Sequence, residues 1–143
     1  KEAGLNTMMT VMEAHRLLEK TIVSGTDGVM LDIKAFGEED HLKVTAMPNK
    51  NTLENAVFLA KMGKLFEIVP SLYQVVDIEN TIIKAGELLR PYQSIHPVRY
   101  KLISYRPFWR QGRVQDLSES VKGYMEQLEE LAYKSGFDDV VTT

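Results

Sequence analysis

The sequence predicts an α/β fold built on a parallel sheet. Apolar, strand-like runs alternate along the chain with stretches of helical periodicity, in the order β-α-β-α-α-β-α-β-α-β. Strands that alternate with amphipathic helices are typical of a parallel sheet joined by right-handed crossovers. The clearest strand, residues 28–33, is apolar except for Asp32, as expected of a strand that is buried on both faces.

Each element is predicted from its local pattern. Asn51 is a candidate helix N-cap with Glu54 three residues later, and Gly63 suits the end of the same helix. The acids at 38–40 suit the first turn of the preceding helix, where they interact favourably with its macrodipole, and this solvated helix start is favoured over a metal-binding run. Strands are predicted at 5–9, 28–33, 65–70, 98–105 and 140–141, and helices within 10–21, 36–45, 51–63, 77–89 and 118–134.

Composition limits the possible functions. The length of 143 residues suits a single domain, residues 1–143, and 44% hydrophobic with 26% charged residues allows a buried core. A net charge of −3 argues against a nucleic-acid partner. No apolar run is long enough to span a membrane and no signal-peptide pattern opens the chain, so a cytoplasmic protein without membrane association is expected. The histidines are too scattered for a metal site, and His41 and His96 are expected at the surface.

The candidate site is the carboxyl end of the strand at residues 28–33. Asp32 and Lys34 are two positions apart, so both side chains leave the same face at the end where α/β proteins bind ligands. An acid beside a base suits a ligand that carries both an ammonium and a carboxylate. The alternative is an ordinary solvated ion pair, worth less than about 1 kcal/mol. The residues expected at the same mouth are Met8, Met9, Pro70, Ser71, Tyr105 and Arg106.

Taken together, the strand endings resemble a known family. The segments that carry the resemblance are Met30-Leu31-Asp32-Ile33-Lys34, Asn49 with Thr52-Leu53, Ile68-Val69-Pro70 and Leu102-Ile103-Ser104-Tyr105. They are similar to the C-terminal half of radical S-adenosylmethionine enzymes, and above all to the activating enzymes of glycyl-radical enzymes, of the pyruvate formate-lyase-activating type. The resemblance implies a partial (β/α)6 barrel, TIM-like and half open, of which this chain would supply about the last four strands.

The resemblance also implies a function for the parent protein. Such enzymes use S-adenosylmethionine and a [4Fe-4S] cluster, receive an electron from a donor such as flavodoxin or ferredoxin, and form a 5′-deoxyadenosyl radical that creates a glycyl radical on a partner enzyme. Asp32 would then face the ammonium and Lys34 the carboxylate of the methionine end, with Met30 to Asp32 beside a monovalent cation. Val69-Pro70 and Tyr105-Arg106 would lie near the adenosine.

The sequence departs from the family pattern in several places. It contains no cysteine, so it cannot ligate an iron–sulfur cluster. We therefore predict no catalytic or metal-binding residue in this chain, and no activity when the chain is alone. Ala46 and Ser71 stand where the family usually has glycine. Short connections suggest that loop residues are absent at Met9–Thr10, at Ile68–Val69 and within 107–113. The alternative function is a non-catalytic α/β nucleotide-binding or interaction module.

Overall fold

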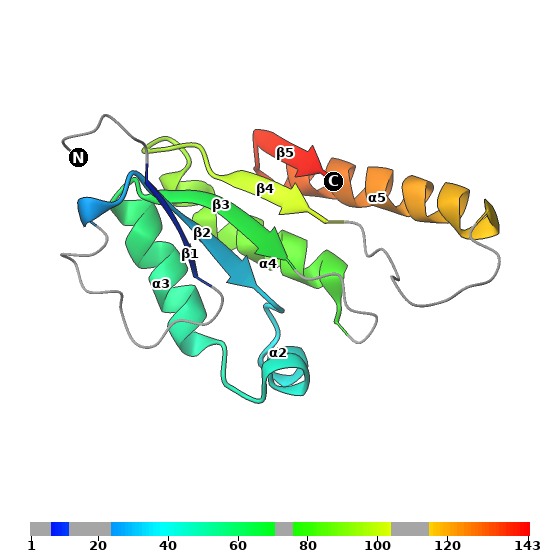
Figure 1. The fold of residues 1–143 in the computed structure, drawn as a ribbon, viewed down its shortest axis with the longest axis horizontal. Helices are drawn as coiled ribbons and strands as arrows, with labels where there is room; N and C mark the ends of the chain where they lie inside the picture. Colours follow the sequence, from blue (N-terminus) through cyan, green and yellow to red (C-terminus); the bar gives the residue numbers. More distant parts are fainter. Residues whose placement is uncertain (1–6, 12–23, 71–75, 104–114) are drawn as a thin grey trace.

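The computed structural model describes residues 7–11, 24–70, 76–103 and 115–143 (Figure 1). Strands and helices alternate within these ranges, as the sequence predicts. The strands are β1 (Met8–Val11), β2 (Gly28–Ile33), β3 (Leu65–Pro70), β4 (Arg99–Leu102) and β5 (Asp139–Thr142). The helices are α2 (Glu38–Thr45), α3 (Lys50–Lys61), α4 (Ile78–Leu89) and α5 (Gln115–Ser135), with a short 3-10 helix, η1 (Arg90–Tyr92). No helix in the described ranges is long and apolar enough to cross a membrane.

The strands form one parallel sheet in the order β1-β2-β3-β4-β5. When neighbouring strands follow one another in sequence, right-handed crossovers place every connecting helix on the same face. Figure 1 shows this arrangement, with β2, β3 and β4 in front of α4. The predicted fold class, a partial (β/α) barrel, is therefore confirmed; the described sheet has the five strands that the order of elements predicts, against the about four that the resemblance implied.

The two faces of the sheet differ in character. Val29, Leu31 and Ile33 of β2 are fully buried and belong to the hydrophobic core beneath the helices. The alternating residues Met30 and Asp32 are partly exposed on the other face, which we call the open face. This alternation follows from the two-residue period of a strand. The core also includes Leu59, Leu65, Ile68, Ile82, Leu89, Tyr100, Leu102, Leu128 and Phe137.

Several element boundaries differ from those predicted. The first strand runs to Val11 and thus includes Thr10, which was predicted to begin a helix; the remainder of that helix lies outside the described residues. Strand β4 ends at Leu102, three residues before its predicted end at Tyr105. Helix α3 begins at Lys50, and its N-cap residue is Asn49 instead of Asn51. The Asn49 side chain does not cap the helix but donates to the carbonyl of Phe36.

The prediction that His41 lies at the surface is wrong. His41 is on α2 and only 1% exposed, and its Nδ1 lies 3.2 Å from the carbonyl oxygen of Ala35. His96 is half-buried. The prediction failed for His41 because α2 is short and polar, so its sequence alone does not reveal which side packs inward.

The strand pairing can be compared with the suggestion that loop residues are absent at Met9–Thr10 and Ile68–Val69. Strand β1 passes through Met9 and Thr10 and pairs continuously with β2. Strand β3 likewise passes through Ile68 and Val69 without a change of register. The pairing therefore gives no support to missing loop residues at these two positions. The third position, within 107–113, lies outside the described residues.

Candidate functional site at the end of strand β2

Asp32 and Lys34, which we call the clamp, lie together at the carboxyl end of β2. Lys34 Nζ is 2.6 Å from Asp32 Oδ2, and the side chains are 13% and 16% exposed, respectively. The period-two argument therefore placed them correctly on one face. A pair that is shielded to this extent differs from the freely solvated pair of the alternative interpretation, because its charges interact with less screening by water.

The pairing register brings further predicted residues to this place. Val69 of β3 lies opposite Asp32 and, like it, is partly exposed. Met30 precedes Asp32 by two residues and therefore lies on the same face of β2. Pro70 lies opposite Ile33, so it shares the helix-covered face of the sheet and is buried. Its ring therefore lies at the same strand end as the clamp but on the opposite face.

Two predicted residues cannot be placed. Tyr105 and Arg106 lie outside the described residues, together with Ser71. The structure thus brings together Met30, Asp32, Lys34 and Val69, and leaves the predicted contribution of the fourth strand end open.

The open face also carries charged residues that the sequence reasoning did not identify. Glu67 of β3 is only 5% exposed, lies opposite Met30 and Arg99 in the strand pairing, and has Lys101 Nζ 3.9 Å away. Arg99 Nε donates to Asp139 Oδ2 at 2.9 Å. The signal that could have revealed Glu67 is a charge within an otherwise apolar strand.

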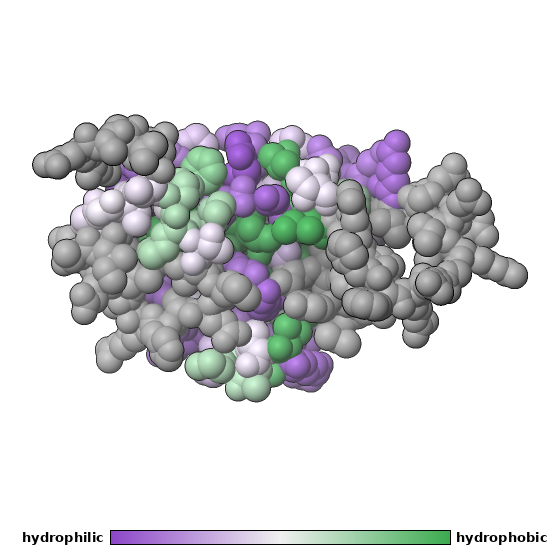
Figure 2. All heavy atoms as spheres, in the orientation of Figure 1, coloured by the Kyte–Doolittle hydropathy of each residue, from purple (hydrophilic) through white to green (hydrophobic). Residues whose placement is uncertain are grey.

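Viewed from the side shown in Figure 1, the surface over the sheet is mixed. Figure 2 shows hydrophilic and hydrophobic residues interspersed over the middle of the molecule. Polar groups beside apolar surface are typical of sites that bind small molecules through a few directed contacts. The residues within the described ranges contain no group of histidine and acidic side chains that could hold a metal ion.

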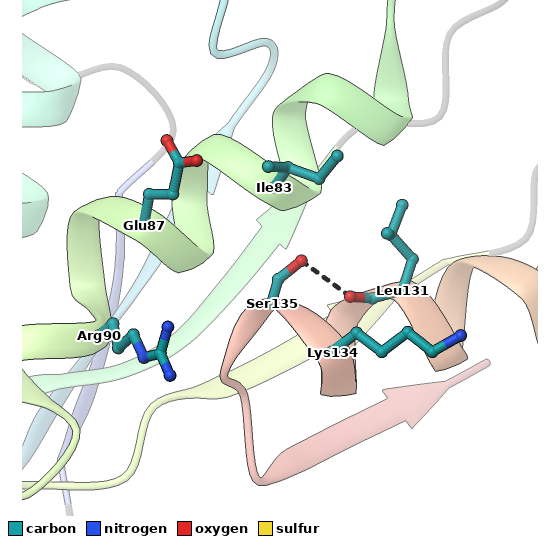
Figure 3. A pocket seen from close by; sticks show the side chains of 6 residues that line it. All are labelled: Ile83, Glu87, Arg90, Leu131, Lys134 and Ser135. Atoms are coloured by element: carbon teal, nitrogen blue, oxygen red, sulfur yellow. Dashed lines mark hydrogen bonds between the residues drawn. The ribbon is translucent and has the colours of Figure 1, made fainter.

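A separate hollow lies on the helix layer (Figure 3). It has a volume of about 530 Å³ and lies between α4 and α5, with lining residues Ile83, Glu87, Arg90, Leu131, Lys134 and Ser135. Helices of a (β/α) unit run antiparallel to its strands, so the C-terminal part of α4 lies near the amino ends of the strands. This hollow is therefore distinct from the clamp, and its rim carries both signs of charge.

Comparison with known proteins supports the predicted resemblance. The chain is 30% identical over 137 residues to the pyruvate formate-lyase-activating enzyme of Streptococcus mutans, a match that takes in 85% of this chain and 50% of that enzyme. The chain thus spans about half the length of this relative. No family model matches the sequence.

A solved structure matches the fold. The crystal structure of a domain of pyruvate-formate lyase-activating enzyme from Bacteroides vulgatus superposes with a TM-score of 0.75, covering 99% of this chain and 83% of the other. At 18% identity this likeness concerns the fold. The sequence match and the fold together confirm the predicted resemblance to activating enzymes of the pyruvate formate-lyase-activating type, and the match to half of the relative's length fits the prediction that the chain corresponds to only a part of such an enzyme.

Proposed function

We propose that this chain, a relative of the pyruvate formate-lyase-activating enzymes, binds the methionine end of S-adenosylmethionine as part of a radical S-adenosylmethionine enzyme. The observation that carries the proposal is the shielded pair of Asp32 and Lys34 at the carboxyl end of a parallel strand. The complete protein would activate a glycyl-radical enzyme, such as pyruvate formate-lyase, in the cytoplasm. An electron donor such as flavodoxin or ferredoxin would be its second partner.

The clamp matches the charges of a bound amino acid. Asp32 would accept hydrogen bonds from the ligand ammonium and Lys34 would donate to the ligand carboxylate, so each ligand group takes over part of the pairing that the two side chains now make. The amino-acid end of the ligand adds no net charge to the clamp, because its ammonium and carboxylate balance each other. Val69, with Tyr105 and Arg106, would lie toward the adenosine, whereas Pro70 is buried on the helix-covered face and would only support this strand end.

An iron–sulfur cluster does not fit the residues of this chain. Such clusters are held by cysteine thiolates, and the chain contains no cysteine. The role proposed for the chain is therefore ligand binding alone, and the isolated chain is expected to release no 5′-deoxyadenosine from S-adenosylmethionine.

The clamp can be tested by ligand binding to the chain itself. We expect S-adenosylmethionine to bind, and Lys34→Met to weaken binding about 10- to 100-fold, because a hydrogen bond to a charged group contributes about 1.5–3 kcal/mol. Lys84→Met is a matched control, since Lys84 pairs with Glu87 on the exposed side of α4. The clamp proposal fails if the wild-type chain binds no S-adenosylmethionine or if both lysine variants bind equally well.

The alternative is a non-catalytic nucleotide-binding or interaction module, which would use the same Asp32–Lys34 pair to bind a ligand without a cluster. The complete protein encoded by the gene separates the two functions after anaerobic reconstitution with iron and sulfide. A [4Fe-4S] absorption band together with reductive release of 5′-deoxyadenosine supports the activating enzyme. A protein that binds a nucleotide tightly but shows neither signal supports the module.

A further inference from the structure

Three buried polar side chains converge on the loop that follows Lys34. His41 on α2 is 1% exposed, Asn49 at the start of α3 is 6% exposed, and Thr81 on α4 is 1% exposed. Burying a polar side chain is costly unless it makes hydrogen bonds. The contacts of these side chains therefore indicate why they are inside.

All three bind the backbone of two consecutive residues, Ala35 and Phe36. His41 Nδ1 lies 3.2 Å from the Ala35 carbonyl oxygen, and the Asn49 amide donates to the Phe36 carbonyl. The Phe36 N–H donates to Thr81 Oγ1 at 3.2 Å. Both carbonyls and the Phe36 N–H are thus engaged by side chains from three separate helices. We call these contacts the loop anchor.

The helices that provide the anchor are also tied to each other. The Thr81 hydroxyl donates to the Asp77 carbonyl at 2.9 Å, which fixes the position of its oxygen. The Asp77 N–H donates to Asp40 Oδ2 at 3.2 Å and so connects the start of α4 with α2. The loop backbone is therefore held in a frame, and Lys34 is the residue immediately before it.

We propose that Thr81 and Asn49 are positioning residues, which hold Lys34 where its ammonium can meet the ligand carboxylate. This inference rests on the function proposed above. The loop anchor contacts the backbone of the two residues that follow Lys34, so we expect it to affect only the part of the ligand that Lys34 binds. Binding of the adenosine end alone should not depend on it.

The test compares Thr81→Val with Thr81→Ser, because valine removes the hydroxyl at nearly constant shape and serine retains it. In Thr81→Val we expect the Phe36 amide to exchange with solvent at least about tenfold faster, and the Kd for S-adenosylmethionine to rise about tenfold, as for the loss of one well-placed hydrogen bond. The Kd for 5′-deoxyadenosine should stay unchanged, and serine should restore both quantities. Thr52→Val, at a threonine that is also buried, is the matched control.

The Lys34→Met variant distinguishes a positioning role of Thr81 from a general destabilisation of the fold. In Lys34→Met, adding Thr81→Val should weaken S-adenosylmethionine binding no further, because the residue being positioned is gone. Full additivity, equal weakening of both ligands, or no rescue by serine would overturn the positioning role. If Thr81→Val does not fold, Asn49→Ala is expected to give the same pattern.

The two proposals fail in different ways. If the wild-type chain binds no S-adenosylmethionine, the proposed function fails and the role of the loop anchor in ligand binding fails with it. If S-adenosylmethionine binds and depends on Lys34, but Phe36 exchange and affinity are the same in Thr81→Val as in the wild type, the loop anchor alone is refuted.

Discussion

Replacing Gly86 with alanine should destabilise the protein, because α4 and α5 pack closely at this position. A Cβ atom on Gly86 would overlap the carbonyl oxygen of Ser135 and stand 2.7 Å from the Ser135 Cβ. Carbon and oxygen atoms rarely approach closer than about 3.3 Å, so the two helices would have to move apart by about 1 Å. Overpacking of this kind costs about 1–3 kcal/mol.

The same substitution also has a favourable effect, which must be separated from the clash. Alanine is better than glycine in a helix interior by about 1 kcal/mol, so the net loss at Gly86 is about 0–2 kcal/mol. Gly123 provides the control, since it lies within α5 and nothing lies within 4 Å of a Cβ placed there. Gly123→Ala should therefore raise the free energy of unfolding by about 0.5–1 kcal/mol.

The difference between the two variants isolates the packing cost, because the helix propensity cancels. Urea unfolding followed by far-ultraviolet circular dichroism should give Gly86→Ala a free energy of unfolding about 1–3 kcal/mol below that of Gly123→Ala. If Gly86→Ala proves as stable as Gly123→Ala, the close contact between Gly86 and Ser135 does not exist in the folded protein.

Two further predictions concern α2 and the loop that follows it. Ala46, at the C-cap of α2, has a φ of 59°, which costs a non-glycine residue about 1–2 kcal/mol. Ala46→Gly should therefore raise the free energy of unfolding by up to about 1 kcal/mol, after the greater conformational entropy of glycine in the unfolded chain is subtracted. A lower free energy of unfolding in urea than that of the wild type would contradict this. The Asp77 N–H and the Lys43 ammonium hold the pKa of Asp40 below its ordinary value. A lowered folded-state pKa stabilises the fold above the unfolded-state pKa, and this contribution is lost as the pH falls through the folded value. Asp40→Asn should hence lower Tm at pH 7 but progressively less below about pH 4, and a difference that is constant down to pH 2 would refute this.

The sheet and the clamp could be predicted because they depend on local periodicity. The alternation of apolar runs and helices predicted a parallel sheet, and the spacing of Asp32 and Lys34 predicted their shared face. The face of Pro70 could not be derived, because β3 carries a register shift opposite Val29 and Met30 that reverses which residues point to the helices. A continuous apolar run such as residues 65–70 gives no indication of such a shift.

The loop anchor was missed for a different reason. The Thr81 hydroxyl oxygen accepts from the Phe36 N–H across a separation of 45 residues, and no local pattern encodes such a contact. The only local indication is a polar residue on the apolar side of α4, between Ile78 and Ile82. Without the fold, this position is indistinguishable from a threonine that bonds only to its own helix.

Three of the six buried polar residues in the described ranges gather around the loop that follows β2. Glu67 lies on the open face, and His41, Asn49 and Thr81 surround the loop after Lys34. Thr52 and Asn55 lie outside this group, and the Asn55 amide has no hydrogen-bond partner among the described residues that would explain its burial. A core built for stability alone gains little from such groups, because each must recover in hydrogen bonds what it loses in hydration. Their concentration around one strand end is expected if the position of Asp32 and Lys34 matters more than the last increment of stability.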